Sequence, residues 1–232
     1  EYACLKDEKF YDRIKSSLLF KSISGDYKTL ENCLENNEEK KIYYANDIEQ
    51  QSVYINMFKN ENIDVVIMDK VLDNQFISLL EYKNDGVKFL RVDASSDALK
   101  TDSGGKEDEA LEKLFREVSG RENLKVTLSA LKDKTVPAVL NISEEARRFN
   151  DMLKMYGMYN GKDMADKQAP EEFTLSLNSE SPIIEKLKNL DEDASKTVAK
   201  QIFNLALLSQ RRLTAEELSE FVKDSYSVLE KL

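Results

Sequence analysis

The chain contains 232 residues, of which 41% are hydrophobic and 34% are charged, and its formal net charge is -10. This length favours two domains, because compact domains usually have about 100 to 200 residues. The negative charge disfavours nucleic acid as a partner, since it repels phosphate backbones. No segment approaches the run of roughly 18 apolar residues that a membrane-spanning helix needs, so no membrane partner is predicted either.

The residue types that carry most enzyme chemistry are scarce. The sequence has no histidine, which removes the commonest general base and the commonest transition-metal ligand, and this lowers the expectation of an active site without excluding one. The cysteines Cys4 and Cys33 form no CxxC or Cys/His cluster, a pattern that favours a reducing compartment. The sequence begins at Glu1 without an initiator methionine or a signal peptide, so we expect it to begin within a longer protein.

The first half of the chain alternates predicted strands and helices. Residues 10–20 have apolar side chains at helical spacing and predict an amphipathic helix, and a short helix begins at Thr29. The elements that follow are strands at 41–45, 63–68 and 87–92 and helices at 51–59 and 73–82. This order predicts a parallel sheet with right-handed crossovers, and hence a small three-layer α/β domain.

A polar segment at 99–106, which contains the pair Gly104-Gly105, predicts a linker. The elements beyond it are a helix at 109–118, a strand pair at 125–130 and 137–142, a helix at 143–156, a strand at 173–177, a helix at 182–190 and two long helices at 194–209 and 215–232. The second half is therefore α+β and ends in two long helices. We predict domains at 1–98 and 107–232.

Five strings occur in an order and with gaps that are typical of one family. They are Ile42-Tyr43-Tyr44, Asp64-Val65-Val66-Ile67-Met68-Asp69, Lys125-Val126-Thr127-Leu128-Ser129, Thr135-Val136-Pro137-Ala138-Val139-Leu140 and Phe173-Thr174-Leu175-Ser176-Leu177-Asn178, the last followed by Pro182-Ile183. On these strings the chain resembles the heat-shock protein 90 family of molecular chaperones in its bacterial form. The resemblance covers nearly the whole chain, from the last part of the family's middle domain through its C-terminal dimerisation domain.

The resemblance implies the C-terminal portion of an ATP-dependent chaperone that assists protein folding under stress. It implies that ATP and magnesium bind to upstream domains of the full-length parent, with no cofactor, metal site, catalytic residue or ATP hydrolysis in this portion. Cytosolic eukaryotic members of the family end in an acidic pentapeptide, whereas this chain ends Leu229-Glu230-Lys231-Leu232. This departure favours a bacterial, cytoplasmic protein, with an organellar one as the alternative.

Apolar stripes on the two terminal helices predict a dimer interface. One small sheet cannot easily bury both stripes, so pairing with the same helices of a second copy is a natural solution, and the resemblance implies such a homodimer. The string Thr214-Ala215-Glu216-Glu217 matches a capping box at the start of the last helix. The candidate interface residues are Val198, Ile202, Phe203, Leu205, Leu218, Phe221, Val222 and Leu229. The alternative is an ordinary helical hairpin within one chain.

A second candidate surface follows from the predicted helix at 143–156, whose apolar face has methionines beside it. Flexible methionine side chains suit surfaces that accept many partners. The resemblance implies that this helix and the helix at 73–82 contribute to a binding surface for unfolded or partly folded client proteins. The client-binding candidates are Phe76, Phe149, Met152, Met155 and Tyr156. The alternative is that each apolar face packs on the sheet of its own domain.

Other classes of function have less support. The turns after the first two predicted strands, Asn46-Asp47 and Asp69-Lys70, contain no glycine-rich phosphate-binding loop. Asp69 ends a strand as in receiver domains, but no acidic pair at the end of the first strand completes a metal site. An enzyme that uses carboxylates alone would need a convergent cluster, which the sequence does not indicate. A dimeric scaffold that binds no clients is the alternative function.

Overall fold

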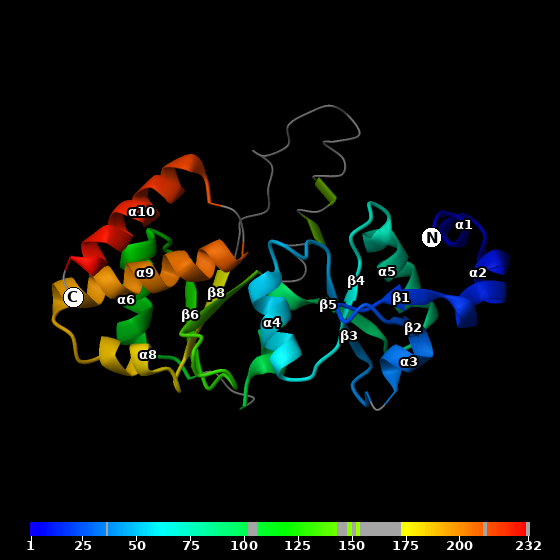
Figure 1. Cartoon of the computed structure of the whole chain (residues 1–232), viewed down its shortest axis with the longest axis horizontal. Helices are drawn as coiled ribbons and strands as arrows, with labels where there is room; N and C mark the ends of the chain where they lie inside the picture. Colours follow the sequence, from blue (N-terminus) through cyan, green and yellow to red (C-terminus); the bar gives the residue numbers. More distant parts are fainter. Residues whose placement is uncertain are drawn as a thin grey trace. The chain divides into compact units, whose positions relative to one another are not determined.

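The computed structural model describes residues 1–35, 37–101, 106–142, 148–149, 152–153, 173–210 and 213–230 (Figure 1). These residues form two compact units. The first comprises Glu1–Ala94 and the described residues of Arg147–Ala169, and the second comprises those of Ser95–Ala146 and Pro170–Leu232. Each unit combines helices with a three-stranded sheet, so the chain is of mixed α/β class, as the sequence predicts.

The first unit is built around a parallel sheet. Its strands lie in the order β4-β3-β5, and β3 pairs in parallel with both neighbours. The helices and strands of this unit are α1 (Tyr2–Lys6), α2 (Glu8–Ile14), β1 (Leu19–Lys21), β2 (Tyr27–Thr29), α3 (Leu30–Leu34), β3 (Lys41–Ala45), α4 (Ser52–Asn60), β4 (Val65–Ile67), α5 (Asp73–Lys83) and β5 (Lys88–Arg91). The alternation of strands and helices thus produces the parallel sheet that the sequence predicts.

Helices α5 and α4 cover opposite faces of this sheet, because successive side chains of a strand point to opposite sides. In β3, Ile42 and Tyr44 belong to the core to which α5 contributes Phe76. The intervening side chain is Tyr43, whose ring centroid lies 4.8 Å from that of Phe58 in α4. A sheet covered on both faces explains why β3 and β4 are apolar almost throughout.

The predicted helix at 10–20 agrees with the end of α2 at Ile14 and with a single 3₁₀ turn at Lys15–Ser17, and it is wrong beyond Ser17. Residues Leu19–Lys21 form β1, which pairs antiparallel with β2 across a turn that contains Gly25 at φ +94°. Phe20 is buried between the exposed residues Leu19 and Lys21, and this alternation is typical of a strand rather than of a helix. The left-handed backbone at Gly25, which glycine adopts without steric cost, allows the turn.

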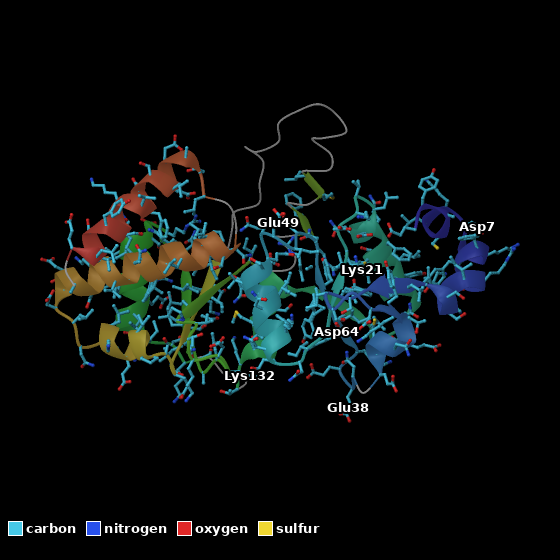
Figure 2. All side chains as sticks on the ribbon, in the orientation of Figure 1. Asp7, Lys21, Glu38, Glu49, Asp64 and Lys132 are labelled. Carbon is cyan, nitrogen blue, oxygen red and sulfur yellow. The ribbon has the colours of Figure 1, made fainter. Side chains whose placement is uncertain are left out.

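Asp64, labelled in Figure 2, ties this hairpin to β4. Its carboxylate accepts a hydrogen bond from Ser22 Oγ and pairs with Lys28 Nζ at 2.5 Å. Burial alone would raise the pKa of Asp64, but the bonds from Lys28 and Ser22 outweigh burial and hold the pKa below its usual range. The backbone N–H of Ile23 donates to Val65 O at 2.9 Å. The hairpin therefore extends the sheet beyond β4.

The second unit contains a mixed sheet. Its helices and strands are α6 (Glu109–Ser119), β6 (Lys125–Ser129), β7 (Ala138–Ile142), β8 (Phe173–Asn178), α8 (Pro182–Leu187), α9 (Glu192–Gln210) and α10 (Ala215–Leu229). The prediction that the strands at 125–130 and 137–142 form a pair is wrong, because β8 lies between them, parallel to β6 and antiparallel to β7. Nearly every residue of β8 is buried, which suits it to the central position.

One face of this sheet packs against α6, α8 and α9. Buried members of this core are Leu111, Phe115, Leu175, Leu177, Ile184, Ile202, Phe203 and Leu207. At the end of β8 the buried side chain of Asn178 accepts a hydrogen bond from Leu131 N–H at 3.0 Å, and donates to the carbonyl oxygens of Asp133 at 3.0 Å and Val136 at 2.8 Å. Asn178 therefore holds the loop after β6 against β8.

Both ends of the predicted linker at 99–106 contact the second unit. Leu99 is buried, Lys100 forms an isolated bridge with Leu131, and Lys106 forms one with Leu128. Residues 102–105, which include the glycine pair, lie outside the described residues. The division between the units falls between Ala94 and Ser95. Residues 95–101 therefore belong to the second unit.

Candidate interaction surfaces

Helix α9 presents one apolar face to the core of its own unit. Ala199, Ile202, Phe203, Ala206 and Leu207 are all buried there. Two of the predicted dimer residues, Ile202 and Phe203, thus lie in the unit's own core, and Val198 packs against the same core while partly buried. Leu205 and Leu208 lie on another side of α9 and are 45% and 39% exposed. The structure therefore separates the α9 candidates into a buried group and an exposed one.

Helix α10 has no buried residue. Its exposed apolar side chains are Leu218, Val222, Tyr226 and Leu229, with exposed fractions of 49%, 43%, 64% and 62%. Spacings of four, four and three residues place these four side chains on one face of a helix. We call them, with Leu205 and Leu208 of α9, the terminal apolar face. Tyr226 is absent from the candidates proposed from the sequence, although its spacing from Val222 indicates the same face.

Polar contacts attach α10 to α9. Lys200 Nζ lies 2.8 Å from Asp224 Oδ2, and Gln201 Nε2 donates to Ser225 Oγ at 2.9 Å. Asp224 and Ser225 thus contact α9 and do not belong to the exposed apolar set of α10. Phe221 is half-buried and does not belong to the exposed set. The packing of α10 on its own chain therefore leaves most of its large apolar side chains uncovered.

The start of α10 is fixed by the capping box that the sequence predicts. Thr214 Oγ1 accepts a hydrogen bond from Glu217 N–H at 3.2 Å, and Glu217 Oε2 accepts one from Thr214 N–H at 2.9 Å. Two backbone donors that a helix start otherwise leaves unpaired are thereby satisfied. This cap helps to define a helix that gains little from burial.

A cavity of about 750 Å³ lies between α6, α9 and α10. Charged side chains line it, and several pair with one another. Lys196 Nζ lies 2.7 Å from Glu117 and 2.9 Å from Glu192. Hydrogen bonds to Glu117 and Glu192 raise the pKa of Lys196. Ion pairs within and between these helices therefore line the cavity, and these pairs help to hold the helices together.

The client-binding candidates have different surroundings. Phe76 of α5 is buried in the core of the first unit, where this helix packs on one face of the parallel sheet. Phe149 and Met152 are 44% and 53% exposed. Met155 and Tyr156 lie outside the described residues. Of the described candidates, Phe149 and Met152 are therefore exposed, whereas Phe76 is buried.

An ion pair that the sequence did not indicate lies beside Phe149. Arg148 donates from Nη1 to Glu81 Oε2 at 3.0 Å and from Nη2 to Glu81 Oε1 at 3.1 Å. Glu81 belongs to α5, and 67 positions separate the two residues. No local pattern in a single sequence marks such a distant pair. Arg148 and Glu81 therefore come from the tertiary structure alone.

Polar side chains form a hydrogen-bond network at the carboxyl end of the parallel sheet. Gln51 Oε1 accepts hydrogen bonds from the backbone N–H groups of Asn46 at 2.9 Å and Asp47 at 3.2 Å. Gln51 Nε2 donates to Asp93, which also pairs with Arg91 at 2.6 Å. This buried network therefore connects the segment after β3 to the segment after β5.

The described residues lack two further features. No helix in the described ranges is long and apolar enough to cross a membrane. Within those ranges, no group of three or more histidine, cysteine, aspartate or glutamate side chains is placed to hold a metal ion.

Comparison with known proteins identifies the family. The family model described as Hsp90 protein matches residues 1–232. The chain therefore belongs to the Hsp90 protein family, and the resemblance inferred from the five strings is confirmed.

The individual relatives are bacterial chaperones. Chaperone protein htpG of Bacteroides fragilis (strain YCH46) is 30% identical over 244 residues, which cover 96% of this chain and 35% of that protein. Chaperone protein HtpG of Bacteroides thetaiotaomicron is 28% identical, covering 83% of this chain and 30% of that protein. That of Porphyromonas gingivalis (strain ATCC 33277) is 26% identical, covering 84% and 31% respectively. The chain thus spans about a third of the length of these relatives.

Proposed function

We propose that this chain is the part of an Hsp90-type chaperone that joins two copies of the protein and offers apolar surface to unfolded or partly folded clients. The observation that carries the proposal is the terminal apolar face, on which α10 leaves Leu218, Val222, Tyr226 and Leu229 exposed. Membership of the Hsp90 family and likeness to bacterial proteins named as chaperones support the chaperone role. By the same likeness we place the protein in the bacterial cytoplasm, with a role in the stress response.

The proposed partner for the terminal apolar face is a second copy of the chain. The exposed apolar stripes of a helix pair can be buried against the same stripes of a symmetric partner. The two helix pairs then form a four-helix arrangement. Leu205, Leu218, Val222 and Leu229 would contact the partner directly. Ile202 and Phe203 would act indirectly, because they hold α9 on the core from which Leu205 projects.

The proposed client surface includes Phe149 and Met152. Both side chains are exposed, and a pair of flexible or aromatic apolar groups can contact many sequences weakly. ATP and magnesium would act through other regions of the full-length protein, and we expect this chain alone not to hydrolyse ATP. Release of phosphate from ATP by the purified chain would contradict that expectation, provided that a substitution in this chain changes the rate and so excludes a contaminating enzyme.

Light scattering across a dilution series tests the dimer. We expect a mass of about twice 26.7 kDa for the wild-type chain, and a single-chain mass for the Leu218→Asp, Leu229→Asp variant. The matched control is Ile183→Asp, Leu190→Asp, which adds the same charges to exposed apolar positions of the same unit. A wild-type monomer at high concentration, or equal dissociation in the control, would remove the dimer proposal.

Suppression of the aggregation of an unfolding enzyme tests client binding. Phe149→Asp, Met152→Asp should reduce the protection, whereas Val71→Asp, Tyr82→Asp should not, although both changes affect exposed apolar residues of the first unit. A dimeric scaffold without client binding is the second candidate function, because the terminal apolar face does not itself require clients. A stable dimer that protects no substrate would favour the scaffold.

A further inference from the structure

The strand β5 is an outer strand of the parallel sheet in the described part of the chain. One side of it pairs with β3, as shown by the hydrogen bond from Lys88 N–H to Lys40 O at 3.0 Å. In a parallel ladder, the next residue directs its backbone groups to the opposite side. The N–H and C=O of Phe89 therefore point away from β3.

Side chains satisfy both of these outward backbone groups. Phe89 N–H donates to Glu81 Oε1 at 2.8 Å, and Phe89 O accepts a hydrogen bond from Arg148 Nη2 at 3.2 Å. The same carboxylate and guanidinium bind each other through two hydrogen bonds. Glu81, Arg148 and the Phe89 backbone thus form a closed three-part link, which we call the β5-edge link.

The chemistry of the β5-edge link makes it a strong local attachment. A guanidinium bound by both nitrogens to one carboxylate is fixed in orientation as well as position. The Glu81 side chain is only 12% exposed and that of Arg148 is 36% exposed. Burial alone would raise the pKa of Glu81, but the bonds from Arg148 and from Phe89 N–H, together with the charge of Lys88, hold the pKa below its usual range. Glu81 is therefore ionised and paired at neutral pH.

The position of Arg148 in the sequence gives the link its importance. Arg148 lies between β7 and β8, which both belong to the second unit, yet the described residues around it group with the first unit. Phe149 follows Arg148 directly, and Met152 comes three residues later. Both remain exposed while Arg148 is held. The link therefore fixes the start of the segment that carries the two described client-binding candidates.

We infer that Arg148 and Glu81 are positioning residues for the client surface, which hold Phe149 and Met152 on the first unit with their apolar side chains open to a client. This inference rests on the proposed function. A segment fixed before binding loses less conformational entropy when a client contacts it, so a preorganised surface binds more tightly than a free one with the same side chains.

The sequence has no tryptophan, so a Phe149→Trp variant carries a single fluorescent reporter on this segment. Its anisotropy should fall when Arg148→Ala is added, because the segment then moves independently of the first unit. The matched control is Lys83→Ala, which removes the ion pair between Lys83 of α5 and Glu8 but leaves the β5-edge link intact. Unchanged anisotropy in the Arg148→Ala variant would overturn the inference.

Binding to reduced, carboxymethylated α-lactalbumin, a permanently unfolded polypeptide, provides the second measurement. Arg148→Ala should weaken binding by about fivefold, and Glu81→Gln by less, because glutamine still accepts from Phe89 N–H but loses the charge. The double variant should bind within about twofold of Arg148→Ala alone, since both changes break one link. Independent, multiplicative losses in the double variant would contradict a shared positioning role.

The two measurements separate the inference from the proposed function. If Phe149→Asp, Met152→Asp weakens binding while Arg148→Ala does not, the client surface stands and the positioning role is wrong. If Arg148→Ala lowers the anisotropy but the unfolded polypeptide binds none of the proteins, the link is real and the proposed client surface is wrong. Amide exchange at Lys88, whose N–H donates to Lys40 O in the ladder with β3, should stay slow when only the segment is released and should accelerate if β5 unfolds.

Discussion

Helices α9 and α10 are neighbours with similar apolar content, and their surroundings are opposite. Figure 1 shows α10, in red, lying along α9, in orange. Helix α9 buries six residues, including Ile202 and Phe203, whereas α10 buries none. Both sequences predict an amphipathic helix equally well. The difference teaches that helical periodicity measures how much apolar surface a helix carries, while the neighbours of the helix decide what covers it.

The physical cause of this difference is the amount of apolar surface on the sheet and on neighbouring helices that each helix can contact. Helix α9 packs against β7 and against α6, so its stripe meets apolar side chains directly. Helix α10 packs mainly on α9, whose apolar face is already occupied. The exposed leucines of α10 therefore remain available for a second copy. The following experiments test this contrast, from the largest expected effect on stability to the smallest.

The same substitution on each helix gives the sharpest comparison. Phe203→Ala should destabilise the second unit by about 3–5 kcal/mol, because it leaves a cavity in the core. Phe221→Ala should cost only about 1 kcal/mol, since that ring is half-buried within the chain. Urea unfolding followed by circular dichroism, at a concentration where the chain is monomeric, measures both. Equal losses would mean that α10 contributes to the core as α9 does.

The sheet that supports α9 depends on Asn178. Asn178→Ala should cost about 2–4 kcal/mol, because it leaves the N–H of Leu131 and the carbonyl oxygens of Asp133 and Val136 without their partner. Asn189→Ala is the matched control, since the Asn189 side chain is exposed and donates to Glu185 O within its own segment. Urea midpoints compare the variants. A loss as small as that of the control would show that water replaces these bonds readily.

Helix α10 should depend on its cap more than α9 does, because it has little burial to stabilise it. Thr214→Ala should cost about 1 kcal/mol, and Thr214→Ser, which keeps the hydroxyl, should restore most of that loss. Amide exchange of residues 215–229 measures the local effect. If exchange there were unchanged by Thr214→Ala, burial against a partner rather than the capping box would define the helix.

The exposed residues of α10 should have the smallest effect on the folding of the single chain. Leu218→Asp should change the free energy of unfolding of the monomer, measured with urea, by less than about 0.5 kcal/mol, because the side chain is 49% exposed. It should nevertheless weaken self-association by more than about tenfold, since the charge would be buried between two copies. A destabilised monomer with unchanged association would reverse the roles that we assign to the two helices.

The sequence predicted local structure well where one pattern dominated. The strand at 41–45 agrees with β3 residue for residue, and the capping box at Thr214 is present. The prediction failed at Leu18–Phe20, where a few apolar residues fit both a helix and a strand, and pairing with β2 decided the outcome. It failed again in pairing β6 with β7, because strand order depends on β8, which follows more than 30 residues after β7.

The candidate surfaces show the same limit. Leu205, Leu218, Val222 and Leu229 are exposed, as the proposed interface requires. Phe203 and Phe76 have the same apolar character but lie in cores. A single sequence cannot separate these groups, because both core and interface positions are apolar at helical spacing.

By itself the sequence determined the family, through five strings in order, and the type of most elements, through hydrophobic period and capping residues. These signals are local, so they can be recognised without knowing which elements pack together in the folded protein. Only the tertiary structure decided which stripe is covered, which strand is central and which distant charges meet. The bidentate contact of Arg148 with Glu81 is the clearest case, because 67 positions separate its partners and only folding brings them within 3.1 Å.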